Sequence, residues 1–369
     1  MIGSSIGKRL IGTVSSSVDR LVGRGLTGRS ANARKRSRAE SLGPEERAAA
    51  LRQIETVYAA AAPLESVDRF FGEAVACDPK LVKVGQRRAG KITADVFDAR
   101  WISRTTTFCD DPQLSARFSA VVENHSAAAR MFLGRRSGGG PGRPAVILVH
   151  GYRAGQYAIE EHVWPMSWLL ERGLDVALFV LPFHAVRAEP RSPPRFPGTD
   201  PRFTNEAFRQ GIADLRALVA FFRARGAPLV GAMGMSLGGY TVGLLSTVEP
   251  ALAFSALLIP LASFADVALE AGRFVGTVDQ QREQHELLER AHHVVSPFAR
   301  TPKVPGDALV VVGGEGDRIT PISHAEKLSR HFDSELVRFP GGHLLQIGRS
   351  DGFRAIGRMM KKHGVFDAR

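Results

Sequence analysis

Apolar residues follow two different patterns along the chain. From about residue 116 onward, short apolar runs alternate with stretches in which apolar residues recur at helical spacing. The predicted strands are 117–122, 128–133, 145–149, 175–181, 229–233, 254–259, 308–312 and 335–339, and the main helices are 163–172, 205–225 and 237–248. Strands that are apolar on both faces and separated by helices are typical of a covered parallel sheet. The pattern predicts an α/β fold with a mostly parallel central sheet and helices on both faces.

The upstream part of the chain does not continue this alternation. Residues 44–76 are rich in Ala with apolar positions at helical spacing, and we interpret 44–110 as a helical N-terminal appendage. Residues 1–43 are basic and contain several glycines, which favours a flexible tail. The main domain is then 111–369. Within it, about 262–304 is long enough for two or three helices and is predicted to form a small helical cap.

The composition is that of a globular protein. The 369 residues are 44% hydrophobic and 23% charged, which excludes a wholly disordered or collagen-like chain. The two cysteines, Cys77 and Cys109, are too few for a disulfide framework or a cysteine-based metal site. No apolar run reaches the length of about 18 residues that a membrane-spanning helix needs. We therefore expect a soluble protein in a reducing compartment, with a cytoplasmic location.

The net charge of +12 comes mainly from the tail. Residues 1–38 carry nine Lys or Arg and one acid, Asp19, whereas the rest has 40 basic and 36 acidic residues. Because the main body has no basic helix and no aromatic residues interleaved with basic ones, we exclude a nucleic-acid partner. Five apolar residues recur at every fourth position of the tail: Ile2, Ile6, Leu10, Val14 and Val18. Peripheral membrane contact through residues 1–40 is therefore an alternative to a flexible tail.

A candidate nucleophile lies where a predicted strand meets a predicted helix. The strand 229–233 leads into Gly234-Met235-Ser236-Leu237-Gly238, after which the helix begins. Such a turn strains the backbone at the serine, and the two flanking glycines remove side chains that would clash. The helix start also directs backbone N–H groups and a positive dipole end at the same place. A second Gly-x-Ser-x-Gly match at 3–7 follows no strand and is discarded.

Serine needs a base and an acid to attack a carbonyl at neutral pH. The strand 308–312 is followed by a glycine-rich loop with Asp317, which we take as the acid, with Glu315 as the alternative. The strand 335–339 is followed by two glycines and His343, which we take as the base. All three residues follow strand ends, where the ligands of open α/β sheets bind.

Backbone N–H groups are predicted to form an oxyanion hole beside Ser236. One donor is Leu237, which immediately follows the serine. The other is expected from the loop after strand 145–149, which begins His150-Gly151. We assign Tyr152, with Arg153 as the alternative.

Together these motifs resemble those of the α/β-hydrolase superfamily. The resemblance covers about residues 110–360 and is carried by His150-Gly151, the turn around Ser236, the Gly-x-Gly-Asp loop and Gly342-His343 in the family's order. It implies a serine hydrolase that cleaves a carboxylic ester or thioester through an acyl-enzyme. An acyltransferase with the same three residues, or a non-catalytic binding protein on the same fold, are the alternatives.

The expected substrate is a small, partly hydrophobic ester. His184 and Arg153 are candidate substrate-binding residues, and Arg187 and Arg191 are further cations that could attract an anionic group. No cofactor is expected. Neighbouring histidines at 285, 292 and 293 lack ligand spacing on a second element, so no metal is expected either.

Overall fold

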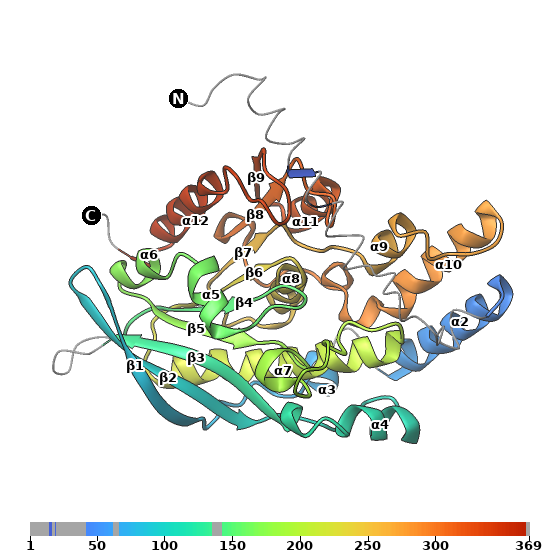
Figure 1. The fold of residues 1–369 in the computed structure, drawn as a ribbon, viewed down its shortest axis with the longest axis horizontal. Coiled ribbons are helices and arrows are strands. Elements are labelled where there is room, and N and C mark those ends of the chain that lie inside the picture. The colour runs from blue at the N-terminus through green and yellow to red at the C-terminus, as the bar shows by residue number, and fades with distance from the viewer. Residues whose placement is uncertain (1–14, 17–18, 20–41, 62–65, 135–141, 367–369) are drawn as a thin grey trace.

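One nine-stranded sheet forms the centre of the computed structural model, which describes residues 15–16, 19, 42–61, 66–134 and 142–366 (Figure 1). Its strands are β1 Lys80–Ala89, β2 Ile92–Ile102, β3 Ser126–Gly134, β4 Ala145–Val149, β5 Asp175–Val180, β6 Val230–Met235, β7 Phe254–Leu258, β8 Leu309–Gly314 and β9 Glu335–Phe339. The spatial order is β1-β2-β3-β5-β4-β6-β7-β8-β9. All neighbouring pairs from β5 to β9 are parallel, and β1, β2 and β3 join them through antiparallel pairs. The predicted α/β class with a mostly parallel sheet is confirmed.

The central strands are covered on both faces. Odd-numbered residues of β4 belong to the apolar cluster that includes α7 (Pro201–Ala224) and α8 (Leu237–Val248). Even-numbered residues belong to the cluster that includes α6 (Met166–Glu171) and α12 (Ser350–Lys362). Because successive strand residues point to opposite faces, a continuous apolar run such as β4 is buried from both sides.

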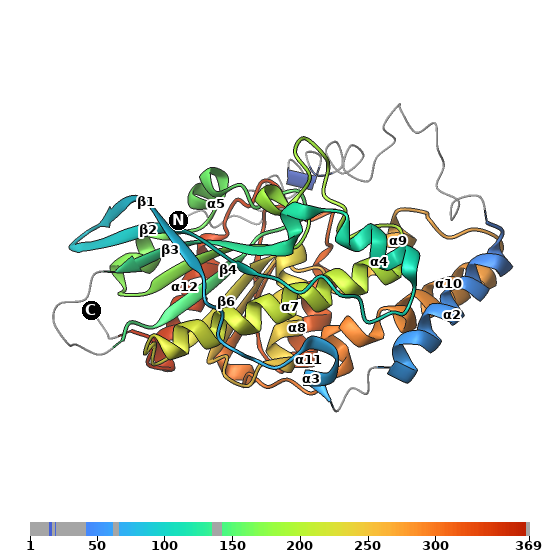
Figure 2. The ribbon, with the colours of Figure 1, turned by 90° about the horizontal axis from the view of Figure 1, so that it is seen from below.

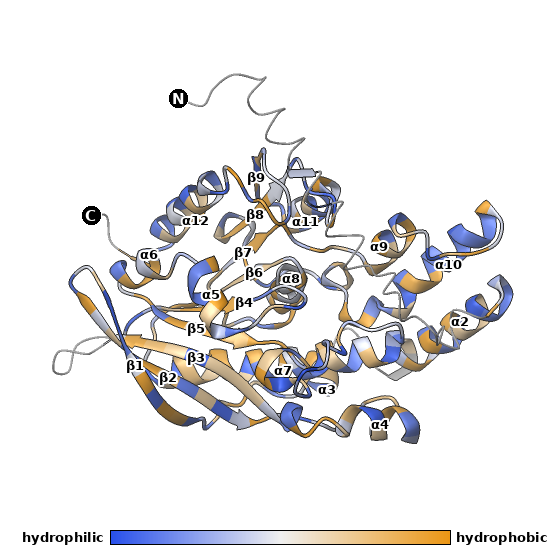
Figure 3. Cartoon of the chain, viewed as in Figure 1, coloured by the Kyte–Doolittle hydropathy of each residue, from blue (hydrophilic) through white to orange (hydrophobic). Residues whose placement is uncertain are grey.

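The remaining helices surround this sheet. They are α2 Pro44–Ala61, α3 Val67–Phe71, α4 Pro112–Ser119, α5 Tyr157–Val163, α9 Phe264–Glu270, α10 Val278–Ala291 and α11 Ile322–Phe332, with 3₁₀ helices at Val122–His125, Ala185–Arg187, His293–Val295, Pro297–Ala299 and Gly306–Ala308. Helix α2 packs against α10, and α7 runs alongside α8 (Figure 2). In Figure 3, α2, α10 and α12 carry both polar and apolar turns, as expected for helices with one buried face.

Two strands occupy the second half of the predicted helical appendage. The hairpin β1–β2 joins the sheet through β2, which pairs with β3 from Ala94–Gly134 to Ile102–Ser126. The prediction that 44–110 is helical is therefore wrong over Lys80–Ile102 and correct for α2 and α3. Strand β1 lies at the sheet edge and is exposed at most of its positions. It consequently lacks the apolar run by which the central strands were predicted.

Two further elements differ from the prediction. The stretch 117–122 is not a strand, because α4 spans Pro112–Ser119. The Asp111 carboxylate begins this helix by accepting from the backbone N–H of Gln113 at 2.8 Å and of Leu114 at 3.1 Å. The predicted helix 163–172 begins too early: α6 spans Met166–Glu171, and Trp164 and Pro165 separate it from α5, which ends at Val163. Proline lacks the N–H that would continue a helix across this point.

The predicted cap region 262–304 contains α9, α10 and two 3₁₀ helices. Helix α10 lies along α2 rather than standing alone, so the N-terminal helix and this insertion support each other. That the helices of this region cover a bound substrate stays a prediction. In the described ranges, none of the helices is both long and apolar enough to cross a bilayer. The possible membrane-facing residues Ile2, Ile6, Leu10, Val14 and Val18 lie outside the described residues.

Candidate active site

Ser236 lies at the turn between β6 and α8 in a backbone conformation that L residues rarely adopt, with φ 56° and ψ −115°. Both glycines of the motif are required by space. A Cβ on Gly234 would lie 2.0 Å from the Gly238 carbonyl oxygen, and a Cβ on Gly238 would lie 2.1 Å from the Val149 carbonyl oxygen. The tight turn predicted from the glycine spacing is therefore present, and it turns the chain sharply at the serine.

The three predicted side chains meet at hydrogen-bonding distance. His343 Nε2 lies 3.0 Å from Ser236 Oγ, and His343 Nδ1 lies 2.7 Å from Asp317 Oδ2. Asp317 follows β8 and His343 follows β9, while Ser236 follows β6. Adjacent parallel strands bring their carboxyl ends to one edge of the sheet, so residues 107 positions apart in the chain are neighbours here. Glu315, the alternative acid, is exposed to solvent.

Thr320 completes this group, and sequence reasoning missed it. Its Oγ1 lies 3.1 Å from Asp317 Oδ2, 3.0 Å from His343 Nδ1 and 3.1 Å from the Ile259 carbonyl oxygen. The other Asp317 oxygen, Oδ1, accepts from the backbone N–H of Ile319 and Thr320, both at 2.8 Å. The Asp-x-x-Thr spacing is the signal that could have identified this turn.

His150 holds the loop that begins at Gly151 against the serine. Its Nδ1 lies 2.7 Å from the Gly151 carbonyl oxygen and its Nε2 accepts from the Leu181 N–H at 3.0 Å. This pattern requires the neutral ring with the proton on Nδ1, and burial lowers the pKa of His150 in agreement. A Cβ on Gly151 would lie only 3.3 Å from the Cβ of Ser236. Glycine therefore allows the loop to approach the nucleophile closely.

The two predicted oxyanion donors belong to helix α8 and to the loop that begins at Gly151. Leu237 is the first residue of α8, and the first N–H groups of a helix have no partner inside it. Tyr152 follows Gly151 on the neighbouring loop and is 37% exposed. Arg153 has a left-handed backbone with φ 61°, and its guanidinium lies over the Tyr152 ring at 5.7 Å. The oxyanion assignment stays a prediction.

His184 lies beside the site but is fully enclosed. Its ring is 6.0 Å from that of Tyr152, its Nδ1 lies 2.9 Å from the Pro182 carbonyl oxygen, and its exposure is 0%. Burial lowers the pKa of His184 to about 3, so the ring is neutral. Within the described part of the chain, its Nε2 has no hydrogen-bond partner. The ring is enclosed in this conformation, and substrate binding by His184 stays a prediction.

Arg187 is not available to a substrate. It is fully buried, and its guanidinium pairs with Asp214 at 2.9 Å and donates to Asn124 Oδ1 at 3.1 Å. The expectation that it could attract an anionic group is wrong, because these buried acceptors already bind it. Arg153 and Arg191 both lie exposed, and the binding of a substrate group by either of them stays a prediction.

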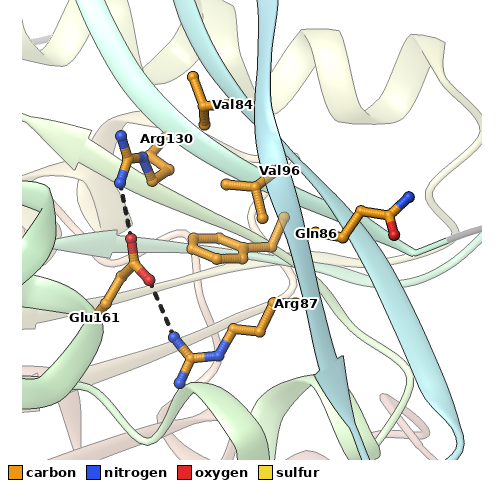
Figure 4. Close-up of a pocket in the computed structure, with 8 residues that line it drawn as sticks. Val84, Gln86, Arg87, Val96, Arg130 and Glu161 are labelled. Carbon is orange, nitrogen blue, oxygen red and sulfur yellow. Dashed lines mark hydrogen bonds and ion pairs between the residues drawn. The ribbon is translucent and has the colours of Figure 1, made fainter.

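Two other places in the described residues bring charged side chains together. Figure 4 shows a surface pocket over β1, β2 and β3, where the Glu161 carboxylate binds Arg87 at 3.1 Å and Arg130 at 2.9 Å. Its charges are paired with each other and it does not include Ser236. Asp266, His285 and Glu289 have ligand atoms within 4.8 Å of one another. Both Asp266 oxygens already have partners, in His285 and Lys327, and Glu289 Oε1 accepts from Ser263.

Part of the predicted flexible tail lies at the site. Ser15, Ser16 and Asp19 are buried. In Figure 1, the short blue stretch of this part of the chain lies near β9 and α11. The Asp19 carboxylate accepts from the backbone N–H of His343 at 2.7 Å. A free tail is therefore the wrong description for these three residues. Nothing in their sequence distinguishes them, because the partners are backbone groups more than 290 positions away.

The sequence comparison finds two similar proteins, both of which are named as uncharacterized. No protein-family model matches it. It is 30% identical over 235 residues to an uncharacterized protein of Mycobacterium tuberculosis, a match that covers 61% of this chain and 56% of the relative. The same values hold for the counterpart in a second strain. The chain thus spans little more than half the length of the curated relatives it matches.

Solved structures give a broader match. The acetyl xylan esterase from Paenibacillus sp. R4 is 13% identical, with a TM-score of 0.59, covering 85% of this chain and 99% of that one. Acetyl xylan esterase 1 from Thermoanaerobacterium sp. JW/SL YS485 is 16% identical, with a TM-score of 0.55, covering 84% and 98%. These matches extend beyond residues 110–360, in agreement with the N-terminal strands of the sheet. The chain has the α/β-hydrolase fold.

Proposed function

We propose that this protein is a serine hydrolase that cleaves a carboxylic ester or thioester. The observation that carries the proposal is the hydrogen-bonded series from Ser236 Oγ through the His343 ring to Asp317, with separations of 3.0 and 2.7 Å. Ser236 is the nucleophile, His343 the general base and Asp317 the residue that orients the imidazole. A serine that merely began a helix would not need this series.

The proposed reaction begins with transfer of the Ser236 hydroxyl proton to His343 Nε2 as Oγ attacks the carbonyl carbon. The resulting tetrahedral oxyanion accepts hydrogen bonds from the backbone N–H groups of Leu237 and Tyr152. His343 then gives its proton to the leaving alcohol or thiol, which departs and leaves an ester on Ser236. Water, deprotonated by the same imidazole, releases the acid and restores the serine.

Asp317 supports the charge that forms on His343 during these steps. Its Oδ2 faces Nδ1 of the imidazole, and its Oδ1 is held by two backbone N–H groups at 2.8 Å. Because the carboxylate is fixed by the chain, it stabilises the imidazolium without having to reorganise. The Thr320 hydroxyl lies within reach of both groups and keeps the pair enclosed.

The neighbouring solved structures guide the choice of substrates. Both are described as acetyl xylan esterases, so acetyl esters are the first class to test. The sequence-based expectation of a partly hydrophobic ester makes longer p-nitrophenyl esters the natural second series. A fall in kcat/KM with acyl length would favour a short-chain esterase, and a rise would favour the hydrophobic substrate.

A covalent probe tests the nucleophile directly. We expect a fluorophosphonate to label the wild-type protein and to leave Ser236→Ala unlabelled, because the probe requires an activated serine. Ser119→Ala, on the exposed end of α4, is the matched control and should label as wild type. Equal labelling of Ser236→Ala and wild type would reject Ser236 as the nucleophile.

Product analysis separates hydrolysis from acyl transfer. With acetyl ester as donor, the proposed hydrolase should release acetate at the same rate with and without added alcohol. If most of the acetyl group is transferred to the alcohol even at a low alcohol concentration, the protein is an acyltransferase that uses the same three residues.

A further inference from the structure

A carboxylate from the N-terminal segment joins the two loops that carry His343 and Asp317. Asp19 Oδ2 accepts from the backbone N–H of His343 at 2.7 Å and of Arg318 at 3.2 Å. Its other oxygen, Oδ1, accepts from the backbone N–H of Leu344 at 3.0 Å. One carboxylate thus binds the residue after Asp317 and two residues of the histidine loop, and it is only 1% exposed.

The two neighbouring serines bind the same loops. Ser16 Oγ donates to the Gly316 carbonyl oxygen at 2.9 Å, and Ser15 Oγ donates to the Leu345 carbonyl oxygen at 3.3 Å. Each serine therefore contacts one of the loops that Asp19 joins. At these positions the loops belong to no helix or strand, so their backbone groups need other hydrogen-bond partners. The N-terminal segment supplies these partners.

Gly342 provides the space for this contact. A Cβ at this position would lie 2.5 Å from Asp19 Oδ2 and 3.1 Å from the Cβ of Ser15. The glycine before His343 therefore does more than permit a turn, because any side chain there would displace the carboxylate. The chain is built so that an anion fits against the histidine loop.

We propose that Asp19 is a positioning residue for the reaction: it fixes the backbone of His343 relative to Asp317, so that the imidazole lies between Asp317 and Ser236. The inference rests on the proposed function. A displacement of about 1 Å at a reacting group can lower the rate roughly a hundredfold, and a charged acceptor on three N–H groups resists such displacement.

The contacts favour positioning over inhibition. Asp19 binds backbone N–H groups, whereas His343 Nε2 and Ser236 Oγ face each other at 3.0 Å. Of the described residues of the segment, Ser15, Ser16 and Asp19 therefore leave the reactive atoms paired with each other. An inhibitory segment would be expected to occupy one of these two atoms.

The test uses full-length Asp19→Gly, which removes the carboxylate and leaves a space of its size. We expect kcat for an acetyl ester to fall by about 10- to 100-fold with KM within about twofold, because the imidazole is displaced and substrate contacts are retained. Added formate should restore much of kcat by binding the three vacant N–H groups. Asp78→Gly, at an exposed position, should match wild type and ignore formate.

Asp19→Asn provides a second variant that keeps the shape. Its NH₂ group must face at least one of the three N–H donors, so kcat should also fall and should not respond to formate, because the site is filled. Circular dichroism should show both variants folded. If Asp19→Gly does not fold, a lower kcat in Asp19→Asn supports the positioning role, and an unchanged kcat contradicts it.

Hydrogen exchange separates this inference from the proposed function. The amides of His343 and Leu344 should exchange faster in Asp19→Gly than in wild type, whether or not the protein turns over an ester. Unchanged exchange, an unchanged or raised kcat, or a loss that formate does not restore would each overturn the positioning role. Absence of fluorophosphonate labelling in wild type would instead reject the serine hydrolase itself.

Discussion

Individual residues at the site are constrained by space as much as by chemistry. Ser236 has a positive φ, and the chain can adopt it because Gly234 and Gly238 place hydrogen atoms where a Cβ would clash. Gly151 has the same role toward the nucleophile from the other side. Glycine at these positions is therefore part of the site, although it carries no reactive group.

Gly151→Ala should impair catalysis more than folding. The added Cβ would lie 3.3 Å from the Ser236 Cβ and 3.8 Å from its Oγ, so the loop must move by a few tenths of an ångström. We expect kcat/KM to fall about tenfold or more, with unfolding free energy changed by about 1 kcal/mol or less. Ester kinetics and urea denaturation measure the two effects, and the prediction fails if the activity is unchanged.

Thr320→Val removes a hydroxyl that faces the imidazole and the carboxylate. The valine side chain cannot donate to Asp317 Oδ2 at 3.1 Å or interact with His343 Nδ1 at 3.0 Å. We expect kcat to fall roughly tenfold, equivalent to about 1.4 kcal/mol in the barrier. Thr320→Ser retains the hydroxyl and is the control. Unchanged kcat in Thr320→Val, or a loss in Thr320→Ser as large as that in Thr320→Val, would contradict a role specific to the hydroxyl.

At the scale of elements, buried polar groups join segments that apolar packing alone would leave free to slide. The fully buried Arg187, in the 3₁₀ helix after β5, binds the Val180 carbonyl oxygen at 3.1 Å and Asp214 of α7 at 2.9 Å. Burial raises the pKa of Asp214, although the neighbouring guanidinium opposes this. The pair connects the sheet, the segment after β5 and the long helix.

Arg187→Met should destabilise the fold strongly, because it leaves the Asp214 carboxylate buried without its cation. We expect the free energy of unfolding to fall by about 3–5 kcal/mol, as for other broken buried pairs. The exposed Arg195–Glu189 pair is the control, since Glu189→Gln should cost about 1 kcal/mol or less. Urea denaturation measures both, and similar small losses would contradict the prediction.

The predictability of an element depended on how it is buried. β4, β9 and α8 have the predicted bounds. β4 is buried throughout and α8 starts at a glycine turn, and both features leave a clear pattern, whereas the edge strand β9 is buried only at Phe339. The hairpin β1–β2 could not be predicted in this way, since β1 is stabilised by pairing with β2 and is otherwise exposed. Pairing between strands depends on register and neighbours, which a single apolar pattern does not contain.

At the scale of the whole molecule, several histidines are buried in the neutral form. Burial lowers the pKa of His184 to about 3, and those of His292 and His324 to about 4. Each hydrogen-bonds through Nδ1, to Pro182, Asn205 and Ala262 respectively. Folding thus disfavours the protonated, charged form of three rings that take up this second proton readily in an unfolded chain.

Stability should therefore fall as the solution becomes acidic. In the unfolded state these rings take up protons near pH 6.5, whereas the folded rings do so only near pH 3 to 4. Between these values the unfolded chain binds more protons, so lowering the pH favours unfolding by up to about 1.4 kcal/mol per pH unit for each histidine. Urea midpoints at pH 7.5 and 5 measure this, and equal midpoints would contradict it.

The sequence by itself determined the α/β class, the turn around Ser236 and the order of serine, acid and histidine. These features follow from local rules of burial, glycine geometry and strand ends, so they can be read within short windows of the chain. Only the tertiary structure decided that Thr320 joins the group, that Arg187 is buried and that Asp19 binds the histidine loop. Those contacts depend on which distant backbone groups face one another after folding, and no local pattern contains that information.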